Sequence, residues 1–525
     1  MTAESHLIEV TLAHLLPAGL PASAGALPVA GLTLDSRKVS AGDVFVALAG
    51  GRADGRQYIN DAINRGAVAV LVDADANPEE IQWLDKVPVI AVNQLAQSVS
   101  AIAARFYQQP TQAMKVIGVT GTNGKTTCSL LLAQLFAVIN GRAGVMGTLG
   151  CGALDSKSAA SLAQQISALP TTGLTTPDPI TVQRLAAELH GQGIASLAME
   201  VSSHSLVQGR VAAVQFDCAI FTNLTQDHLD YHGSLAAYGE AKQQLLKAQG
   251  LRYAIVNADD AWAKSLLTRM PLTVAALSYS VSDISADIYA RELQLTFDGI
   301  RAEIVTPWGV GELRSSLLGE FNLSNLLAVI AAAGVQDVPL ARILEVIPQL
   351  CAAPGRMQSV YLEQPEIDQD IHVVVDYAHT PAALETTLNA IRAHQPGRIW
   401  TVFGCGGDRD TSKRPLMGRI AERLSDYVIV TNDNPRGEDP AVIAADILRG
   451  MHNTHGCLVI ADRAQAIDLA IQQARPGDLI LVAGKGHEDY QIFATQTIEF
   501  SDVKQVRLSL QRRLEKQLKA KEVQP

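Results

Sequence analysis

The stretch Gly118-Val-Thr-Gly-Thr-Asn-Gly-Lys-Thr-Thr127 is a glycine-rich turn that ends in a lysine and two threonines. Residues 115–120 predict a buried strand before it, and residues 126–139 predict an apolar helix after it. Where a strand feeds a helix N-terminus, backbone N–H groups and the helix dipole face bound phosphates. Lys125 would reach the terminal phosphates, and the Thr126 hydroxyl would ligate Mg²⁺. The stretch therefore predicts a nucleotide triphosphate site.

The glycine spacing is a variant of the usual phosphate loop. The strict motif requires glycine at position 119, where this chain has Val119, and its glycines fall at 118, 121 and 124. A chance glycine turn between a strand and a helix is the alternative, but the lysine, the threonine and both flanking elements favour a nucleotide. The residues expected to bind ATP here are Gly121, Thr122, Asn123, Gly124, Lys125, Thr126 and Thr127.

Composition describes an ordinary globular protein of several domains. The chain has 525 residues, of which 48% are hydrophobic and 18% charged. Its longest apolar stretches are too short for a bilayer span, and its N-terminus lacks the pattern of a signal peptide. Six scattered cysteines form no disulfide framework, and a net charge of -11 argues against nucleic-acid binding. We expect a cytoplasmic monomer with no nucleic-acid partner and no membrane insertion.

Two breaks in the strand–helix pattern predict three domains. The first is the polar segment 107–112, and the second lies near Ala352-Ala-Pro-Gly355. We expect an α/β protein with a small N-terminal α/β domain (1–110), a central P-loop domain with a mostly parallel sheet (111–353) and a C-terminal Rossmann-like α/β domain (354–525). The strands expected in the first two domains are 43–48, 68–72, 115–120, 194–201, 214–223 and 253–257, with a helix at 58–65.

The last block repeats strand then helix five times, with strands expected at 372–376, 399–403, 427–431, 458–460 and 479–482 and a terminal basic amphipathic helix at 504–521. Four of the five strands run into polar loops rich in Gly, Asp or His. In open α/β sheets the ligand crevice lies at the carboxyl ends of the strands. We therefore expect four loops to share one edge: 376–379, 404–410, 432–436 and 484–488.

Polar residues also follow two strands of the central block. Glu200 ends one strand, and the segment Gln226-Asp-His-Leu-Asp-Tyr-His232 follows the next. Hard cations beside phosphates prefer oxygen ligands, in some sites with one imidazole, so Mg²⁺ is the expected metal. A single His or Asp in such a loop is more often a cap or a turn residue. The residue patterns alone do not separate the roles of Thr222, Asn223, Asp227, Asp230 and His232.

These motifs, taken together and in order, resemble the Mur ligases of cell-wall synthesis over nearly the whole chain. The resemblance rests on Gly121-Thr-Asn-Gly-Lys-Thr126, Met199-Glu-Val-Ser-Ser-His204, 223–232, Leu318-Gly-Glu-Phe-Asn-Leu-Ser-Asn325 and Asp376-Tyr-Ala-His-Thr-Pro381. Further motifs resemble the members that add meso-diaminopimelate to the UDP-N-acetylmuramoyl-dipeptide ending in D-glutamate. These are Leu34-Asp-Ser-Arg37, Thr175-Thr-Pro177, Cys405-Gly-Gly-Asp-Arg-Asp410, Asp433-Asn-Pro-Arg436 and Gly484-Lys-Gly-His-Glu488.

The resemblance implies roles for residues outside the phosphate loop. It implies that the UDP-linked substrate is held by Leu34, Ser36, Thr175, Thr176, Ser202, Gln208 and Arg210, and that ATP is also served by Asn322, Arg356, Asp376 and His379. It implies catalytic roles for Lys125, Glu200, His228 and Lys242, with Mg²⁺ held by Thr126, Glu200, His228 and a carbamylated Lys242. Carbamylation requires a neutral amine to meet CO₂, hence a lysine whose pKa is lowered. A solvated helical lysine is the alternative.

For the acceptor amino acid, the resemblance implies Arg409, Asp433, Asn434, Pro435, Arg436, Gly484 and Glu488. Charge agrees with this set, because meso-diaminopimelate carries two carboxylates and two ammonium groups. Forked arginines suit a carboxylate, and Glu488 suits an amine. Lysine would leave Arg436 without its carboxylate, whereas a cap or turn arginine at this position would give no such selectivity.

The expected reaction is ATP-driven amide formation through an acyl phosphate, with closure of the domains around the nucleotide. Two alternatives within the same chemistry remain open: a lysine-adding Mur ligase and a ligase like folylpolyglutamate synthetase. A nucleotide-dependent switch or transport ATPase is an alternative from another class, although the guanine-reading Asn-Lys-x-Asp sequence is absent.

Overall fold

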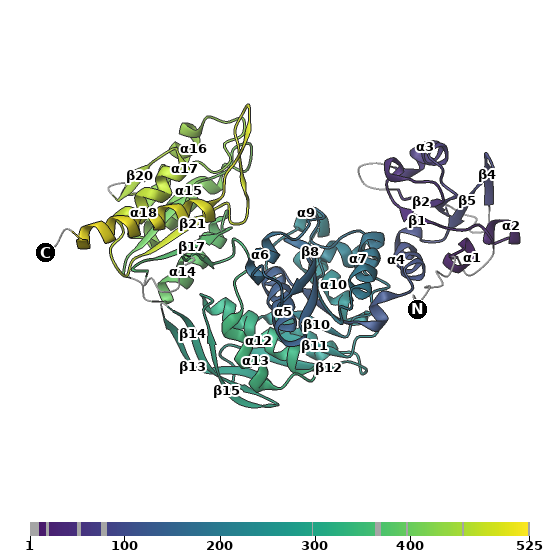
Figure 1. The fold of residues 1–525 in the computed structure, drawn as a ribbon, viewed down its shortest axis with the longest axis horizontal. Helices are drawn as coiled ribbons and strands as arrows, with labels where there is room; N and C mark the ends of the chain where they lie inside the picture. Colours follow the sequence, from purple (N-terminus) through teal and green to yellow (C-terminus); the bar gives the residue numbers. More distant parts are fainter. Residues whose placement is uncertain are drawn as a thin grey trace. The chain divides into compact units, whose positions relative to one another are not determined.

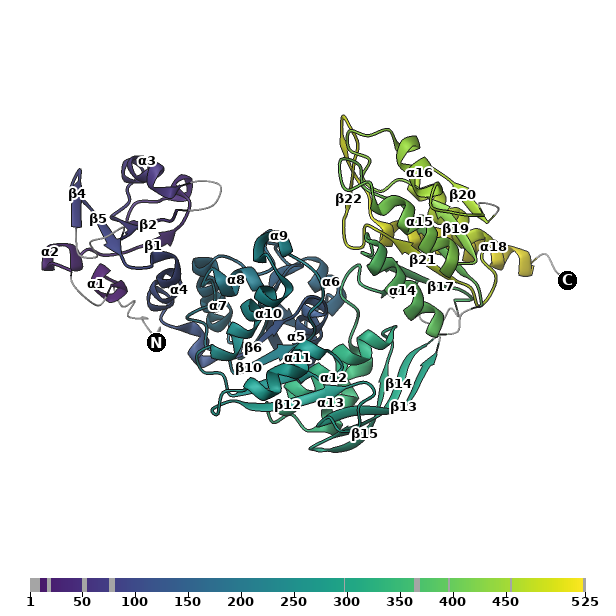
Figure 2. The same cartoon turned by 180° about the vertical axis from the view of Figure 1, so that it is seen from behind.

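The computed structural model describes residues 10–16, 20–49, 54–74, 81–296, 298–362, 369–394, 397–453 and 456–522. The chain forms two compact units. Unit 1 comprises Met1–Ala160 and Ala168–Tyr279, and unit 2 comprises Ser161–Ser167 and Ser280–Pro525. Figures 1 and 2 show the elements of both units from opposite sides.

Unit 1 begins with a five-stranded sheet of order β1-β2-β3-β5-β4, parallel except for the edge strand β4. Strand β2 is buried on both faces: Val44 and Val46 pack in the cluster that includes Ile102 of α4, and Phe45 packs in a second cluster. The elements are β1 (Gly31–Thr33), β2 (Asp43–Ala47), β3 (Ala69–Asp73), β4 (Ile81–Leu84), β5 (Val87–Val92), α1 (Leu12–Leu15), α2 (Ala22–Gly25), α3 (Ile59–Asn64), α4 (Leu95–Phe106), η1 (Ser36–Lys38), η2 (Gly55–Tyr58) and η3 (Pro110–Ala113).

The second sheet of unit 1 has the strand order β12-β11-β10-β6-β9-β7-β8. Its pairs are parallel except for the β7–β8 hairpin. Because β6 lies between β10 and β9, the glycine-rich loop that follows β6 emerges between the carboxyl ends of both neighbours. The strands are β6 (Lys115–Thr120), β7 (Arg142–Gly147), β8 (Gly150–Asp155), β9 (Ser196–Glu200), β10 (Cys218–Phe221), β11 (Tyr253–Asn257) and β12 (Ala275–Ser280).

Helix α5 (Lys125–Asn140) follows the loop, and its apolar residues are buried on all sides, including Leu131, Leu132 and Leu135. Gly124 precedes it in the left-handed region with φ 86°, and Gly141 ends it with φ 88°, conformations that favour glycine. The other helices of this part are α7 (Pro179–Gly191), α8 (Ser203–Val207), α9 (Leu229–His232), α10 (Leu235–Gln243), α11 (Ala261–Leu266), η4 (Gln244–Lys247) and η5 (Leu267–Arg269).

Unit 2 contains the antiparallel strands β13, β14 and β15 and a six-stranded sheet of order β16-β17-β21-β18-β19-β20, in which only β16 is antiparallel to its neighbour. Strands β17, β18 and β21 form its buried centre. The strands are β13 (Ile288–Thr296), β14 (Gly299–Thr306), β15 (Gly309–Ser315), β16 (Gln358–Ser359), β17 (His372–Asp376), β18 (Ile399–Phe403), β19 (Tyr427–Val430), β20 (Cys457–Val459), β21 (Leu479–Ala483), β22 (Tyr490–Ile492) and β23 (Thr497–Glu499).

The helices of unit 2 cover both faces of this six-stranded sheet. Residues of α14, α15 and α16 form one core with it, and residues of α17 and α18 form the other. The helices are α6 (Leu162–Ser167), α12 (Glu320–Gly334), α13 (Leu340–Val346), η6 (Ile347–Gln349), α14 (Pro381–Ala393), α15 (Lys413–Leu424), α16 (Pro440–Leu448), α17 (Arg463–Gln473) and α18 (Asp502–Glu522).

The α/β class and the expected strands are confirmed, with shifts at several ends. Strands β6, β11, β17 and β18 have the expected bounds. The expectation for 214–223 was too long, because β10 covers only Cys218–Phe221, and 194–201 shortens to Ser196–Glu200. Strand β20 begins one residue before the expected 458–460, and α18 begins at Asp502 rather than at 504. The structure also contains hairpins that the sequence pattern did not predict: β4–β5, β7–β8, β13–β15 and β22–β23.

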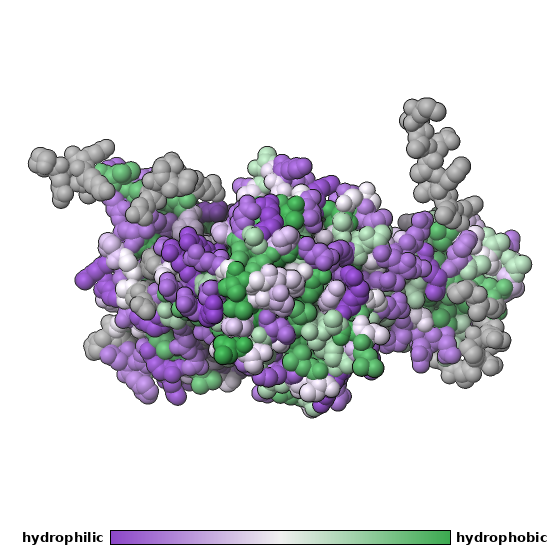
Figure 3. Space-filling view, turned by 90° about the horizontal axis from the view of Figure 1, so that it is seen from below, coloured by the Kyte–Doolittle hydropathy of each residue, from purple (hydrophilic) through white to green (hydrophobic). Residues whose placement is uncertain are grey.

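Across the described ranges, no helix has both the length and the apolar character that a membrane span requires. In Figure 3 hydrophilic side chains are interspersed with apolar ones on the face shown.

Candidate active site

The phosphate loop is held in shape by the residues that follow β10. The backbone N–H of Asn123 donates to Asn223 Oδ1 at 2.9 Å, and that of Thr122 donates to the Asn223 carbonyl at 2.8 Å. The Thr222 hydroxyl donates to the Asn123 carbonyl at 2.6 Å. Gly121 allows this close approach, since a Cβ there would lie 1.9 Å from Thr222 Oγ1. Thr222 and Asn223, whose roles the sequence left open, therefore shape the loop.

Lys125 lies at the first turn of α5 and folds back over the loop. Its Nζ donates to the carbonyls of Gly121 and Thr122, each at 2.8 Å. A lysine anchored there places a positive charge where the backbone N–H groups of the helix N-terminus converge. The arrangement is suited to bind phosphate.

Glu200, at the end of β9, is buried and is held by two threonines. It accepts hydrogen bonds from the Thr126 hydroxyl at 2.9 Å, the Thr148 N–H at 2.8 Å and the Thr148 hydroxyl at 3.2 Å. Burial raises the pKa of Glu200, while Lys125 and these hydrogen bonds act in the opposite direction. Gly147 lies against the same carboxylate, since a Cβ at that position would approach Glu200 Oε1 to 2.3 Å.

Five of the residues expected to hold the UDP-linked substrate form a connected group beside Glu200. The Thr176 hydroxyl donates to the Glu200 carbonyl at 2.8 Å and accepts from the Ser202 N–H at 3.1 Å. Thr175 accepts from the Thr148 hydroxyl at 3.1 Å. Arg210 donates to the Thr176 carbonyl at 2.8 Å and to Gln208 Oε1 at 2.9 Å. Polar side chains thus converge next to the phosphate loop.

The other two residues of that expected set lie in the N-terminal sheet. Leu34 directly follows β1 and packs partly buried against its core, and Ser36 begins η1 and is buried. The structure describes no hydrogen bond between either side chain and the group beside Glu200. Their role in binding the UDP end stays a prediction.

Lys242 is buried within α10, with 1% of its surface exposed. Its Nζ donates to the Gly121 carbonyl at 2.7 Å and lies 4.3 Å from the centre of the Tyr238 ring. Burial, and next the charge of Lys125, lower the pKa of Lys242 to about 6. Most of this amine is therefore neutral at neutral pH, which carbamylation requires. The structure thus disfavours the alternative of a solvated helical lysine.

The His228 ring also lies near Tyr238, with 6.0 Å between the ring centres. It adopts a left-handed backbone with φ 51°, and its ring lies 4.9 Å from that of His204. His232, nearby, shares a hydrogen bond of 2.9 Å with the Ser203 hydroxyl. The rings of His228 and His232 and the amine of Lys242 therefore all lie close to the Tyr238 ring.

The expected Mg²⁺ ligands fit a hard cation by their chemistry, because they comprise a hydroxyl, a carboxylate, an imidazole and a lysine able to become a carbamate. Thr126 and Glu200 are in direct contact. Across the residues that the structure describes, no three His, Cys, Asp or Glu side chains are grouped to hold a metal by themselves. A metal site here would therefore depend on Thr126 and on the modified lysine.

In unit 2, the residues expected to serve ATP gather around the end of β17. Asp376 is buried, accepts from the Met357 N–H at 2.7 Å and from the Ala378 N–H at 2.8 Å, and burial raises its pKa. Arg356 lies over the Tyr377 ring at 4.8 Å, and His379 lies 4.6 Å from that ring. Asn322 lies in the first turn of α12, where it donates to the Leu318 carbonyl at 2.8 Å.

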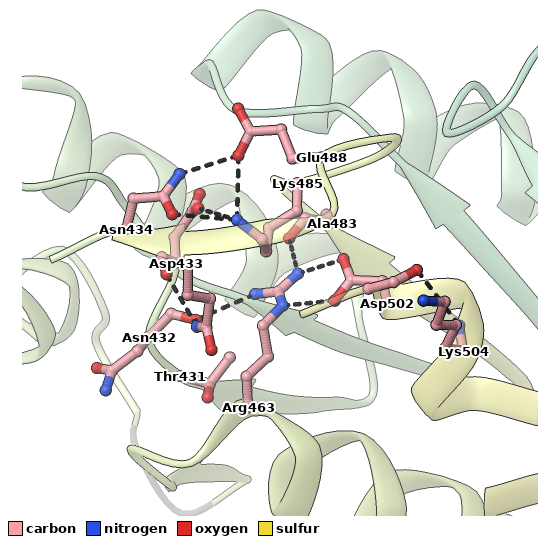
Figure 4. Close-up of polar contacts among 12 residues, drawn as sticks. Thr431, Asn432, Asp433, Asn434, Arg463, Ala483, Lys485, Glu488, Asp502 and Lys504 are labelled. Carbon is pink, nitrogen blue, oxygen red and sulfur yellow. Dashed lines mark hydrogen bonds and ion pairs between the residues drawn. The ribbon is translucent and has the colours of Figure 1, made fainter. Parts of the chain in front are cut away.

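The expected acceptor residues at the ends of β19 and β21 come together around one buried cation, Lys485 (Figure 4). Its Nζ lies 3.0 Å from Glu488 Oε2, 3.2 Å from Asn434 Oδ1 and 3.6 Å from Asp433 Oδ1. The Asn434 amide also donates to Glu488 at 2.9 Å. Burial raises the pKa of Asp433, although Arg463 and Lys485 act against that rise.

Arg436 reaches the loop that follows β18. Its Nη1 donates to the Gly407 carbonyl at 2.9 Å, and its backbone has φ 52°. Gly406 leaves room for it, since a Cβ there would lie 2.8 Å from that nitrogen. A Cβ at Gly484 would lie 3.0 Å from Asp433 Oδ2, so this glycine allows a close approach to Asp433. The Arg409 side chain is exposed. The expected meeting of the loops is confirmed, because Gly484 N–H donates to the Asp376 carbonyl at 3.0 Å and completes the shared edge.

A second buried cation, Arg463, lies beneath the same loops and was not identified from the sequence. It forms a two-pronged ion pair with Asp502, with N–O distances of 2.7 and 2.8 Å, and both side chains are fully buried. Although burial disfavours a charged guanidinium, the Asp502 carboxylate more than compensates, and the pKa of Arg463 is raised. Arg463 also donates to the Ala483 carbonyl at 2.9 Å.

Thr148 and Lys485 were also missed. Lys485 lies in the motif Gly484-Lys-Gly-His-Glu488, between two residues that were expected to bind the acceptor. Its position in the sequence could therefore have identified it. Thr148 gave no usable signal, because it follows a hairpin strand that the sequence pattern did not predict. Asp502 likewise gave no usable signal, because it begins a terminal helix for which the sequence predicted no part in the site.

Three domain families match the chain. Residues 28–107 match "Mur ligase family, catalytic domain", residues 119–333 match "Mur ligase middle domain", and residues 355–486 match "Mur ligase, glutamate ligase domain". Together these matches account for most of the chain.

Curated relatives and a solved structure are similar over nearly the full length. A protein of Ectopseudomonas mendocina (strain ymp), named UDP-N-acetylmuramoyl-L-alanyl-D-glutamate--2,6-diaminopimelate ligase, is 49% identical, with 92% of this chain and 95% of the relative covered. A protein of the same name from Coxiella burnetii (strain RSA 493 / Nine Mile phase I) is 43% identical, with 95% and 99% covered. A solved structure of an enzyme of that name is 35% identical, has a TM-score of 0.74 and covers 97% of this chain and 100% of its own.

Proposed function

Because this chain belongs to the Mur ligase family, we propose that it uses ATP to join meso-diaminopimelate to UDP-N-acetylmuramoyl-L-alanyl-D-glutamate in peptidoglycan precursor synthesis. The observation that carries this proposal is the cluster of Asp433, Asn434 and Glu488 around Lys485. It provides carboxylates for an ammonium group, and Arg436 on the same loop provides a guanidinium for a carboxylate. The curated relatives that carry the same activity in their names support the choice of acceptor.

The proposed reaction has two steps. The side-chain carboxylate of the D-glutamyl residue attacks the γ-phosphorus of ATP, the bond to the bridging oxygen breaks, and ADP leaves. The amine of diaminopimelate then attacks the carbonyl of the acyl phosphate, loses a proton and displaces phosphate. Phosphorylation is required because a free carboxylate has no adequate leaving group. Lys125 and the N–H groups at the start of α5 stabilise the charge that develops on the phosphate oxygens.

We propose that Thr126, Glu200, His228 and Lys242, the last as a carbamate, hold Mg²⁺. When bound, the ion would neutralise phosphate charge during transfer. The contact of Thr126 with Glu200 and the low pKa of Lys242 support this assignment. Thr175, Thr176, Ser202, Gln208 and Arg210 are proposed to bind the UDP-linked peptide, as their hydrogen-bonded grouping supports, with Leu34 and Ser36 at its uridine end.

For unit 2, we propose that Asn322, Arg356, Asp376 and His379 serve ATP, and that Arg409, Pro435 and Gly484 join the acceptor site. The division into domains at 1–110, 111–353 and 354–525 is part of the same proposal. We also propose that the protein is cytoplasmic, because its six scattered cysteines do not have the spacing of a disulfide framework, and that it is a monomer.

Product analysis tests the proposal. ADP and phosphate should appear only when the UDP-linked dipeptide and diaminopimelate are both present, and mass spectrometry should detect the tripeptide product. A panel with meso-diaminopimelate, L-lysine and L-glutamate as competing acceptors distinguishes this activity from that of a lysine-adding or a glutamate-adding ligase. Rapid ATP hydrolysis with neither substrate would contradict the proposal.

A further inference from the structure

The residues proposed to hold the acceptor do not position themselves. Asp433 and Glu488 are both carboxylates, and they approach the same ammonium group, so without it their charges would repel each other. Lys485 is the group that lies between them, and it also contacts Asn434. Its side chain is 0% exposed, so its charge acts on these neighbours and on the Tyr490 ring, 5.4 Å away, rather than on solvent. A single buried cation thus fixes three side chains of the candidate acceptor site.

A second layer lies directly below, as Figure 4 shows. Arg463 donates to the carbonyl of Ala483, the last residue of β21, at 2.9 Å and to the carbonyl of Asn432 at 3.4 Å. These carbonyls belong to the backbone that leads into the two acceptor loops. The guanidinium itself is oriented by Asp502, the first residue of α18. The pair therefore joins β19, β21 and α18 at one point.

Neither cation can touch a substrate, because both side chains are fully buried and their nitrogens face protein groups. Resting on the proposed function, we propose that Lys485 and the Arg463–Asp502 pair are positioning residues for the acceptor amino acid: Lys485 fixes the side chains that receive it, and the pair fixes the backbone that carries them. Their contribution is to the affinity for the acceptor, since the phosphoryl transfer step uses other residues.

The structure contains a matched comparison for this idea. Arg513, also on α18, forms a two-pronged pair with Asp370 at 3.0 and 2.7 Å, and its side chain is 10% exposed. Asp370 precedes β17, and its carbonyl accepts from the Gly477 N–H ahead of β21. This pair thus ties the same helix to the same sheet, but at the amino ends of the strands. The Arg513–Asp370 pair is therefore a control for the effect of removing an ion pair between α18 and the sheet, because it does not contact the acceptor loops.

The main test replaces Lys485 by methionine in the full-length chain. We expect the KM for meso-diaminopimelate to rise about tenfold to a hundredfold, the range expected for losing a hydrogen bond to a charged group. The KM values for ATP and for the UDP-linked dipeptide should change by no more than about twofold, because Asp433, Asn434 and Glu488, the side chains that Lys485 holds, are not among the residues proposed to bind them. Lys485→Arg should also raise the acceptor KM, because a planar guanidinium cannot replace a compact ammonium between three partners.

Two further variants complete the test. The double variant Arg463→Met/Asp502→Leu removes both charges and leaves neither buried alone; we expect it to raise the acceptor KM as well. The double variant Arg513→Met/Asp370→Leu should leave the acceptor KM near that of the wild type, whichever way it shifts the melting temperature. If Lys485→Met gives no cooperative melting transition, Lys485→Arg and the Arg463/Asp502 double variant decide the proposal.

An unchanged acceptor KM in folded variants of Lys485 and of the Arg463–Asp502 pair would overturn the inference. So would an equal rise in the KM values of all three substrates, which indicates a general loss of structure. The wild-type protein separates this inference from the proposed function. If wild-type protein forms no product with diaminopimelate, the function is wrong, whereas a normal wild type with unaffected variants refutes only the positioning role.

Discussion

The hydroxyl of Thr126, in the first turn of α5, donates a hydrogen bond of 2.9 Å to the carboxylate of Glu200 at the end of β9. This contact joins the phosphate loop to the neighbouring strand and puts a carboxylate beside the position expected for the terminal phosphates. A negative group so close to bound phosphate would be unfavourable unless a cation lies between them.

Replacing Glu200 by glutamine should therefore reduce activity roughly a hundredfold at saturating substrates, the scale of losing one group that stabilises a transition state. The Mg²⁺ concentration for half-maximal rate should increase, because the amide is a weaker ligand. Initial rates measured across a Mg²⁺ titration provide the test. Glu188→Gln, at an exposed position on α7, is the control. An unaltered Mg²⁺ dependence in Glu200→Gln would refute its role.

Thr148 should matter because it holds Glu200 through both its N–H and its hydroxyl. Thr148→Val keeps the N–H and removes the hydroxyl, and we expect a loss of about tenfold to a hundredfold in kcat, as for other groups that orient a metal ligand. Thr148→Ser restores the hydroxyl and should recover most of that loss. Equal activities of the valine and serine variants would show that the hydroxyl has no such role.

Lys242 should require CO₂ for its function. Lys242→Arg places a permanently charged group there that cannot be carbamylated, and we expect its activity to fall at least about a hundredfold, as metal-site defects do. Wild-type activity should decrease in CO₂-depleted buffer and return on addition of bicarbonate. The rates of wild type, Lys242→Arg and Lys247→Arg, with its exposed side chain as control, are compared in both buffers. An active Lys242→Arg variant would exclude the carbamate.

Arg436 should determine the preference for diaminopimelate over lysine. Replacing it by methionine removes the partner of the distal carboxylate, and we expect the ratio of kcat/KM for the two acceptors to fall roughly tenfold to a hundredfold. The value of kcat/KM should fall for diaminopimelate and stay nearly unchanged for lysine. Competition between the two acceptors, read by mass spectrometry, measures the ratio directly. A ratio equal to that of the wild type would indicate an arginine that only supports the turn.

His372, at the start of β17, should make stability depend on pH. Burial lowers its pKa from 6.5 to about 4. Between these values the unfolded chain binds the proton and the folded chain does not, so the free energy of unfolding is greatest above pH 6.5 and decreases as the pH falls towards 4. His372→Gln should remove roughly 1–3 kcal/mol of this dependence. Urea unfolding at several pH values tests it, with exposed His452→Gln as control.

Much of the fold was predictable because buried parallel strands have a strong local signal. Strand β6 and the glycine-rich loop after it occur where the residues indicated, and four of the five repeated strands of unit 2 bring their polar loops to one edge as expected. Those features depend on runs of β-branched residues followed by glycine or aspartate. The whole signal therefore lies within one short segment of the sequence. The antiparallel hairpins have weaker alternation, and they were missed.

The candidate site was predictable only for residues that resemble motif positions. Thr148, Arg463 and Asp502 act through partners that are distant along the chain: Arg463 and Asp502 are separated by 39 residues, and Thr148 and Glu200 by 52. A pattern within one short segment of the sequence cannot predict contacts between residues so far apart along the chain. The state of Lys242 also required the structure, because a helical lysine has the same sequence whether it is solvated or buried.

Lys485 and Arg463, which are buried behind the acceptor loops, have a consequence for protein engineering. Attempts to redesign the enzyme for a different amino acid should vary the side chains at the rim, such as exposed Arg409, and leave Lys485 and Arg463 unchanged. Variants changed at Lys485 or Arg463 would lose affinity for the original amino acid, and they would not gain an ordered binding site for a new one.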